Sequence, residues 1–188
     1  MKRAELLSQR SRGDGARRMM FDCQPVLAGR LVHARPLRGD DLDALWAVAS
    51  DPLIWEQHPA KERGTLDGFR TFFDESLASA GALLVTDASS GAAIGSSRFD
   101  RYDEGRREVE IGWTYLARSH WGGAYNGELK HLMLRHAFRF VDSVLFYIDV
   151  NNIRSQRAIE RIGALLESGP DERDRLRYRI TATPRPTQ

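Results

Sequence analysis

The segment from Val109 to Val141 joins an apolar strand to an amphipathic helix through a turn of small residues, Gly122-Gly123-Ala124. A strand is predicted over 107–116 because apolar residues alternate there and β-branched and aromatic side chains dominate. A helix is predicted to begin near Asn126, because the apolar residues after it recur at the spacing of one helical face. These residues are Leu129, Leu132, Met133, His136, Ala137 and Phe140.

A strand, a small-residue turn and a helix in this order can bind an anion. Gly122 and Gly123 let the main chain approach a ligand closely. Free N–H groups at the helix start point outward, and the helix dipole adds about half a positive charge, so phosphate is the natural ligand. The alternative is a plain tight turn between a strand and a helix. The spacing matches neither a P-loop nor the G-x-G-x-x-G fingerprint of dinucleotide-binding folds.

The turn and its flanks resemble the acetyl-CoA pyrophosphate loop of the GNAT N-acetyltransferases, in the branch of the ribosomal-protein acetyltransferases RimJ and RimL. The matching stretch is 121–128, WGGAYNGE, against the branch pattern W-G-x-G-Y-A-x-E-A. Ala124 stands for the second glycine, Gly127 is a further departure, and Ser119 replaces the Gln or Arg that often opens the motif. Two further matches are Glu110 in E-I-G-W and the Asn152-x-x-Ser155 pattern with 159–163 after it.

The resemblance covers residues 26–180 and implies an α+β fold, the α/β sandwich of GNAT acyl-CoA acyltransferases. Its sheet is mixed and mostly antiparallel, with about seven strands, flanked by helices and split between the fourth and fifth strands. Here those strands are 107–116 and 144–150. In the family the pantetheine arm of acetyl-CoA lies in the split and pairs with the main chain like an added strand. The implied cofactor-binding residues are Tyr115, Leu116, Trp121, Gly122, Gly123, Ala124, Tyr125, Asn126, Gly127 and Asn152.

Direct attack of an amine on a thioester requires a base. Most of the amine is protonated at neutral pH, and general-base help is worth about 10² to 10⁴ in rate. The resemblance at E-I-G-W makes Glu110 the predicted base, with Glu108 as a competitor on the same face of the strand. The alternative is that both glutamates face solvent. A main-chain N–H within 113–115 is expected to stabilise the oxyanion, at a bulge of the strand.

The CoA thiolate that leaves has to be protonated, and Ser155 is the candidate acid, with Tyr147 and Tyr178 as runners-up. Asn152 is predicted to cap a helix over 153–162 that stops at Gly163. Capping alone would explain this asparagine. A contact to pantetheine, which the resemblance implies, is compatible with capping.

The remaining segments complete an alternation of strands and helices. Helices are predicted from Asp40 or Asp41 up to Pro52 and over 65–77, and the strands 82–86 and 93–99 are expected to form a hairpin around Gly91. Further strands are predicted over 27–33, 144–150 and 173–181.

The loop after the first helix holds the candidate substrate-binding residues Trp55 and His58. In the family this region forms one wall of the acceptor groove. The alternative is that Trp55 fills the core and His58 is a turn residue before a proline. No metal is expected, because the histidines lack the spacing of zinc ligands and the chain has a single cysteine. His120, beside the loop, is either a turn residue or a phosphate contact.

Length and charge restrict the classes of protein to which this chain can belong. A chain of 188 residues fits one domain, which we place at 21–183, with a loose tail at 184–188. Residues 1–20 hold six basic residues against two acidic ones, although the whole chain has a net charge of only +2. This segment is therefore expected to be a disordered basic extension, and the charge argues weakly for a nucleic-acid partner. No apolar run is as long as a membrane span, and the lone Cys23 fits the cytoplasm.

Three functions remain open on this basis. The first is acetylation of a protein or peptide N-terminus with acetyl-CoA, following the branch resemblance. The second is acetylation of a small-molecule amine such as a polyamine, an antibiotic or a metabolite. The third is a non-catalytic acyl-CoA-binding module, which a Glu110 buried against an arginine, together with the absence of an acceptor groove, would favour. The sequence leaves the acceptor, the physiological acyl group and the choice between monomer and homodimer open.

Overall fold

The computed structural model describes residues 20–182, so the predicted basic extension and the loose tail lie outside the described residues, apart from Met20. One mixed sheet has the strand order β1-β2-β3-β4-β5-β6-β8-β7. Its strands are β1 (Leu27–Ala28), β2 (Val32–Pro36), β3 (Ala82–Asp87), β4 (Ala93–Asp103), β5 (Glu108–Leu116), β6 (Ser143–Asp149), β7 (Leu165–Ser168) and β8 (Arg175–Thr181). The helices are α1 (Leu42–Ala49), α2 (Leu66–Ala78), α3 (Ala124–Ala137) and α4 (Ile153–Glu160). The predicted α+β class is confirmed, with eight strands.

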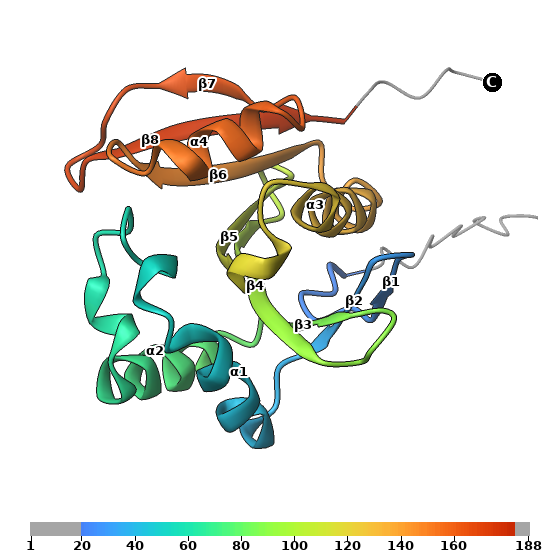
Figure 1. Cartoon of the computed structure of the whole chain (residues 1–188). Coiled ribbons are helices and arrows are strands. Elements are labelled where there is room, and N and C mark those ends of the chain that lie inside the picture. The colour runs from blue at the N-terminus through green and yellow to red at the C-terminus, as the bar shows by residue number, and fades with distance from the viewer. Residues whose placement is uncertain (1–19, 183–188) are drawn as a thin grey trace, which may run out of the picture.

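The sheet opens between its two parallel strands. β5 and β6 are paired only from Glu108 opposite Ser143 to Glu110 opposite Leu145. Every other neighbouring pair is antiparallel, and β5 continues beyond this contact to Leu116 beside β4. In Figure 1, β6, β8 and β7 with α4 form a separate upper layer that diverges from β4 and β5. The split predicted between the strands 107–116 and 144–150 is thus present.

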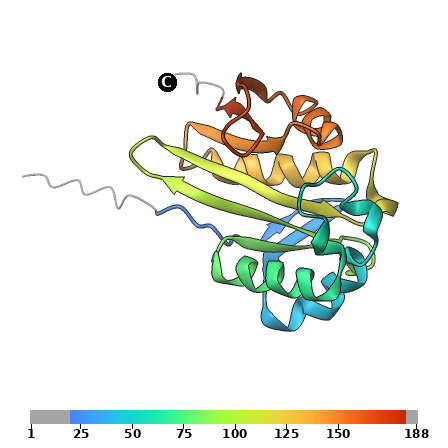
Figure 2. The same cartoon turned by 90° about the vertical axis from the view of Figure 1, so that its left-hand side faces the viewer.

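Helices cover the two faces of the sheet unequally. α3 packs on one face over the larger apolar cluster, which includes Phe99, Val109, Ile111 and Leu129. α1 and α2 pack on the other face over a second cluster that takes in strands β3 and β5. Figure 2 shows the hairpin turn between β4 and β5 projecting beyond both helical layers. Glu108 and Glu110 of β5, next to the split, contact Arg179 and Arg101 respectively.

β5 bulges before it ends. Arg98 lies opposite Gly112 and Ser96 opposite Tyr115, so β5 has one residue more than β4 between these pairs. Trp113 takes a φ of +51°, which is a costly conformation for a bulky residue. The bulge predicted within 113–115 is confirmed. Bulges of this kind turn main-chain groups out of the ladder, and here they do so beside the split.

The prediction of one strand over 27–33 is wrong, because Gly29 starts a turn that separates β1 from β2. Main-chain N–H groups of Arg30, Leu31 and Val32 donate to the Glu128 carboxylate on α3, at 3.0, 2.6 and 2.9 Å. A Cβ on Gly29 would lie 2.5 Å from Glu128 Oε2, so only glycine allows this approach. The turn therefore attaches the β1–β2 hairpin to α3.

We expect Glu128→Gln to destabilise the domain at neutral pH. Burial raises the pKa of Glu128, but the three N–H donors outweigh burial and hold it below its usual value. The stabilisation is therefore present above the unfolded-state pKa of the carboxyl group and is lost as the pH falls through the folded-state value. Urea unfolding at pH 7 should show a loss of about 1–2 kcal/mol. An equal loss at pH 3 would contradict this assignment.

The helix limits differ from the predictions by up to two residues. α3 begins at Ala124 rather than near Asn126, α4 ends at Glu160 rather than at 162, and Gly163 follows it with a φ of +93°. β7 was not predicted, because its four residues are all exposed and do not alternate. No helix among residues 20–182 is long and apolar enough to cross a membrane.

Candidate active site

The predicted anion-binding loop connects β5 to α3. Gly122 has a φ of +74°, in the region that favours glycine, and Gly123 is the N-cap of α3. No side chain caps this helix and its first turn contains no acidic residue. The main-chain N–H groups of Ala124, Tyr125 and Asn126, which form the first helical turn, are thus left for a ligand. The alanine that replaces the second glycine of the motif occupies a helical position, where it needs no special backbone conformation.

Trp121 attaches the loop to the end of β5. Its Nε1 donates to the Leu116 carbonyl at 2.8 Å, so this main-chain acceptor at the end of β5 has a partner within the protein. The Arg154 guanidinium, from the first turn of α4, lies 3.9 Å from the centre of the Trp121 ring. Arg154 Nη2 also donates to the Ile54 carbonyl at 2.8 Å. Trp121 and Arg154 together connect the loop, α4 and the segment after α1.

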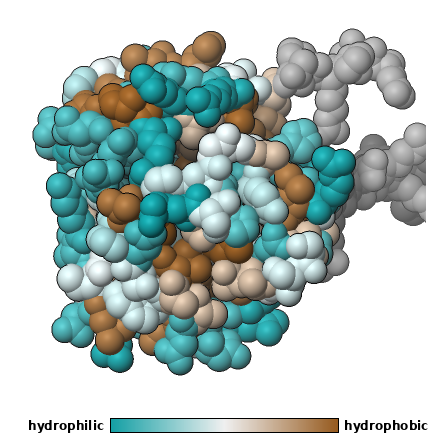
Figure 3. All heavy atoms as spheres, in the orientation of Figure 1, coloured by the Kyte–Doolittle hydropathy of each residue, from teal (hydrophilic) through white to brown (hydrophobic). Residues whose placement is uncertain are grey.

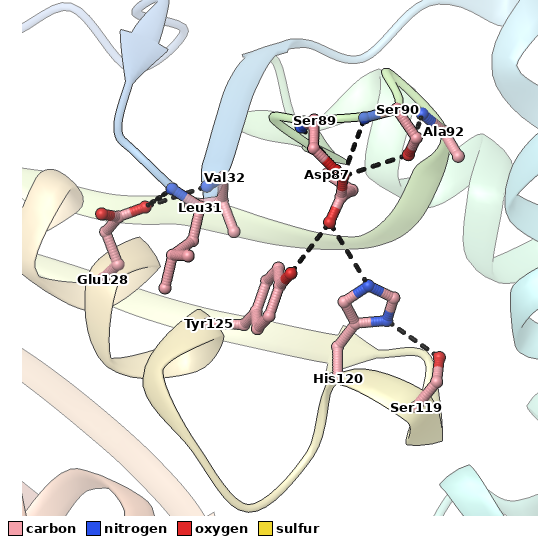
Figure 4. A network of polar contacts seen from close by, with 10 residues as sticks. All are labelled: Leu31, Val32, Asp87, Ser89, Ser90, Ala92, Ser119, His120, Tyr125 and Glu128. Carbon is pink, nitrogen blue, oxygen red and sulfur yellow. Dashed lines mark hydrogen bonds and ion pairs between the residues drawn. The ribbon is translucent and has the colours of Figure 1, made fainter.

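A second set of contacts fixes the loop from the side of β3 (Figure 4). Tyr125 Oη donates to Asp87 Oδ2 at 3.0 Å, and the His120 ring lies edge-on against the Tyr125 ring. His120 Nδ1 lies 2.9 Å from Ser119 Oγ, and Nε2 lies 3.6 Å from Asp87 Oδ2. Both ring nitrogens of His120 therefore face protein groups. This arrangement agrees with a turn residue, the first of the two interpretations of His120.

Glu110 lies on β5 at the last residue pair before the split, with only 3% of its surface exposed. Its Oε2 accepts from Arg101 Nη1 at 2.9 Å, and about half of the Arg101 side chain remains exposed. Burial raises the pKa of Glu110 to about 7, although the charge of Arg101 opposes that shift. A carboxyl group with this pKa is present in both protonation states at neutral pH.

Glu108, the competitor, is paired differently. Its Oε1 accepts a short hydrogen bond from Arg179 Nη1 on β8, and Arg179 also contacts Glu167. Glu108 thus belongs to an ion-pair network that reaches from β5 to β8 and β7, whereas Glu110 is desolvated beside the split. The structure therefore separates two glutamates that the sequence left as alternatives.

The residues predicted to protonate the leaving thiolate occupy different surroundings. Asn152 Oδ1 accepts from the Ser155 main-chain N–H at 3.2 Å, which confirms the predicted cap and places Ser155 in the first turn of α4. The ring of Tyr147, on β6 beyond the split, lies between the guanidinium groups of Arg101 and Arg175, at 5.5 and 5.0 Å. Tyr178 is 2% exposed, belongs to the core cluster under α3, and donates to Glu160.

The two predicted substrate-binding residues differ in exposure, because Trp55 is buried and His58 is half-buried. Trp55 is 3% exposed, donates from Nε1 to the Ala49 carbonyl at 2.8 Å, and packs against the Tyr115 ring at 5.2 Å. The His58 ring stands edge-on against Trp55, and burial lowers its pKa to about 4. Trp55 therefore occupies the core position that was its alternative, and His58 is neutral at physiological pH.

Three functional candidates were missed from the sequence: Arg101, Lys130 and Arg154. Arg154 contacts Ile54 across 100 residues, so no local pattern indicates that contact. Arg101 is only nine residues from Glu110, but the two meet through the pairing of β4 with β5, which has no spacing motif of its own. Lys130 is 3% exposed and lies among α3 residues that are nearly all buried, including Met133 and Leu134 at the helical spacings i+3 and i+4. A wider apolar face on this helix, which includes Leu134, would have predicted that Lys130 is buried.

A cavity of about 500 Å³ opens between α1 and the turn Arg118–His120. Its lining residues are Ala47, Val48, Asp51, Ala117, Arg118 and Ser119. Arg118 and Asp51 form an ion pair within this lining. The face of the molecule drawn in Figure 3 mixes hydrophilic and hydrophobic residues, with one hydrophobic area near its middle and others towards the upper edge. Among residues 20–182, no group of three His, Cys, Asp or Glu side chains is arranged to hold a metal ion.

Comparisons with known proteins agree with this geometry. Residues 32–165 match the family model described as acetyltransferase (GNAT) domain. A GCN5-related N-acetyltransferase from Brucella melitensis is 21% identical, with a TM-score of 0.74 over 84% of this chain and 79% of that one. RimJ from Mycobacterium smegmatis, solved with CoA-disulfide, is 20% identical, with a TM-score of 0.64 over 85% of each chain. Spermidine N-acetyltransferase from Vibrio cholerae, solved with CoA and spermine, is 17% identical, with a TM-score of 0.65 over 81% and 96%. No curated protein matches.

Proposed function

Since the chain belongs to the GNAT acetyltransferase family, we propose that it transfers the acetyl group of acetyl-CoA to a protein or peptide N-terminal amine. The observation that carries the proposal is the environment of Glu110. This residue has a desolvated carboxyl group whose pKa is raised to about 7 by burial, beside the split that separates β5 from β6. This value suits a general base at neutral pH.

Acetyl transfer in this site needs no covalent enzyme intermediate. The acceptor nitrogen attacks the thioester carbonyl carbon while Glu110 removes its proton, directly or through a water. A main-chain N–H at the Trp113 bulge stabilises the oxyanion. The C–S bond then breaks as the carbonyl re-forms, and Ser155 passes a proton to the CoA thiolate while taking one from water. Glu110 then releases the acceptor's proton to solvent. The loop 121–127 and Asn152 hold the pyrophosphate and the pantetheine arm, with the main chain of Tyr115 and Leu116 beside the arm.

The choice of a protein or peptide N-terminus follows the loop 121–128, which resembles that of the RimJ and RimL branch, and is supported by the similarity to RimJ from Mycobacterium smegmatis. The charges around Glu110 do not select the acceptor. Arg101, Arg175 and Arg98 act on its carboxyl group electrostatically, but so does Asp100, and Arg98 and Arg175 are paired with Asp100 and Asp171. The relative from Vibrio cholerae was solved with spermine, so a small-molecule amine, polyamines included, is the second candidate.

The burial of Glu110 against Arg101 is also one of the two features expected of a non-catalytic acyl-CoA-binding module. We therefore propose a test that separates binding from turnover. Calorimetric titration with acetyl-CoA measures the first, and release of the CoA thiol measures the second, with N-terminal peptides, spermidine and simple monoamines as acceptors. Micromolar binding with peptide-dependent thiol release supports the proposal. Binding without release for any acceptor would favour the module, and preference for spermidine would overturn the acceptor assignment.

We expect Arg101→Met to shift the pH dependence of acetyl transfer. The guanidinium at 2.9 Å stabilises the ionised form of Glu110 and so opposes the effect of burial on its pKa. Without it, the pKa of Glu110 rises further above 7 and the rising limb of kcat/KM against pH moves to higher pH. Arg70→Met on the exposed side of α2 removes an arginine without touching the split and serves as the control. If the rising limb of kcat/KM did not move, Glu110 would not be the group that sets the pH dependence of acetyl transfer.

A further inference from the structure

A lysine is buried beneath the split without a counter-charge. Lys130, on α3, is 3% exposed, and its Nζ donates to Thr114 Oγ1 at 2.5 Å and to Ser97 Oγ at 3.4 Å. Lys130 forms no ion pair with any carboxylate of residues 20–182. A buried, uncompensated ammonium group is costly. Such a cost is expected where a charge contributes to function rather than to stability.

The position of Lys130 relates it to the reaction site. Thr114 lies in the part of β5 that has already left β6, and Nζ also lies 5.9 Å from the centre of the Phe146 ring on β6. The amine is therefore placed between the two strands, on the α3 face of the sheet, where they diverge. Glu110 lies on β5 only four residues before Thr114, but its carboxylate contacts Arg101 rather than this cluster.

Two hydroxyl groups connect the amine to the bulge. Thr114 Oγ1 lies 2.7 Å from Ser97 Oγ, and each hydroxyl also approaches the Gly112 carbonyl, at 3.3 Å from Thr114 and 3.5 Å from Ser97. These contacts draw the Gly112 carbonyl towards α3. Because the peptide unit is planar and trans, the N–H of Trp113 in the same unit points the opposite way, out of the α3 side. That N–H belongs to the bulge assigned above to the oxyanion.

We propose that Lys130 is a positioning residue for acetyl transfer, which acts through Thr114 and Ser97 to orient the Gly112–Trp113 peptide and stabilise the oxyanion. This inference rests on the proposed function. A charged donor makes the hydrogen bond to Thr114 stronger than a neutral one would, and it adds a positive charge under the developing negative charge. The positive φ of Trp113 is the strain that this arrangement holds in place.

The charge of Lys130 depends on pH near neutrality. Burial lowers the pKa of Lys130 to about 7. The groups that face its Nζ are Ser97 on β4, Thr114 on β5 and Phe146 on β6, and none of these ionises near neutral pH. On α3 itself, Glu128 is held by the β1–β2 turn, and His131 is the nearest other ionisable residue along the chain. Transfer thus requires an ionised Glu110 and a protonated Lys130, and its rate should pass through a maximum.

Lys130→Met tests this inference, because methionine keeps most of the length and removes the charge. We expect kcat to fall about 10- to 100-fold with KM for acetyl-CoA nearly unchanged, and the falling limb of kcat above pH 7 to disappear. Stability gives a readout that does not depend on turnover. The folded wild type binds fewer protons than the unfolded chain between about pH 7 and 10, so its stability rises with pH there, and that rise should be absent in the variant.

Thr114→Val provides the second variant, and Ser76→Ala, which removes a buried hydroxyl from α2, is its matched control. If Lys130 acts through Thr114, the double variant should lose no more activity than the stronger single variant. Wild-type kcat in Lys130→Met, or additive losses in the double variant, would overturn the inference while leaving the proposed function intact. Absence of turnover in the wild type would overturn both.

Discussion

Replacing Glu110 with glutamine should lower kcat by about 10² to 10⁴ and leave acetyl-CoA binding unchanged. Glutamine has the same shape and can still accept from Arg101, so the fold and the ion-pair partner keep their positions. It cannot take a proton from the acceptor amine. Thiol release with the best peptide acceptor measures kcat, and calorimetry measures the affinity. Loss of binding together with turnover would mean that Glu110 holds the domain together instead of acting as the base.

The stability of Glu110→Gln gives an independent check. The folded-state pKa of Glu110, about 7, lies above its ordinary value of 4.5, so the folded state binds more protons between these values. The Glu110 contribution to stability therefore falls as the pH rises from about 4.5 to about 7, whereas the glutamine variant lacks this dependence. Glu108→Gln is the matched control, because it removes a paired carboxylate two residues away. If only this control lost turnover, Glu108 would be the base.

Replacing Gly122 with valine should weaken acetyl-CoA binding about 10- to 100-fold, a loss of about 1–3 kcal/mol. The φ of +74° is unfavourable for any residue with a Cβ and most unfavourable for a β-branched one. The loop would relax to another path, and the N–H groups at the start of α3 would no longer point at one phosphate position. No atom lies within 4 Å of the added Cβ, so the change affects conformation and not packing.

A glycine with a similar conformation offers the control for Gly122→Val. Gly163, after α4, has a φ of +93°, and an added Cβ would only touch Ile180 at 3.9 Å. Gly163→Val should lower the thermal stability of the domain about as much as Gly122→Val does, because both positions have a positive φ. It should leave the affinity for acetyl-CoA near the wild-type value. Equal affinities for wild type and Gly122→Val would contradict the assignment of the phosphate loop.

Local rules predicted the parts of the fold that depend on neighbouring residues. The hairpin around Gly91 and the Asn152 cap each follow from residue chemistry within a few positions of the chain, whereas the bulge after Gly112 was expected from the family resemblance. The strand over 27–33 failed for the opposite reason. Its N–H groups bond to Glu128, and a sequence pattern cannot show a partner so far along the chain.

The site could likewise be predicted only where its residues belong to local motifs. The glycine turn and Glu110 could be predicted because the resemblance rests on contiguous motifs, and the structure adds the burial that raises the pKa of Glu110. Trp55 was misleading, because a tryptophan in a loop has the same sequence signature whether it lines a groove or fills a core. Lys130 was passed over because a charged residue within an apolar stripe is ordinarily assigned to the exposed face.

The contact between the β1–β2 turn and Glu128 also has a consequence for synthesis of the chain. Leu31 leaves the ribosome 97 residues before its acceptor. At about 5–20 residues per second, this separation corresponds to about 5–20 s in which the first hairpin has no partner for these amides. The predicted phosphate loop is synthesised directly before Glu128. The beginning of the domain and this loop, although far apart in the sequence, therefore both depend on synthesis having reached α3.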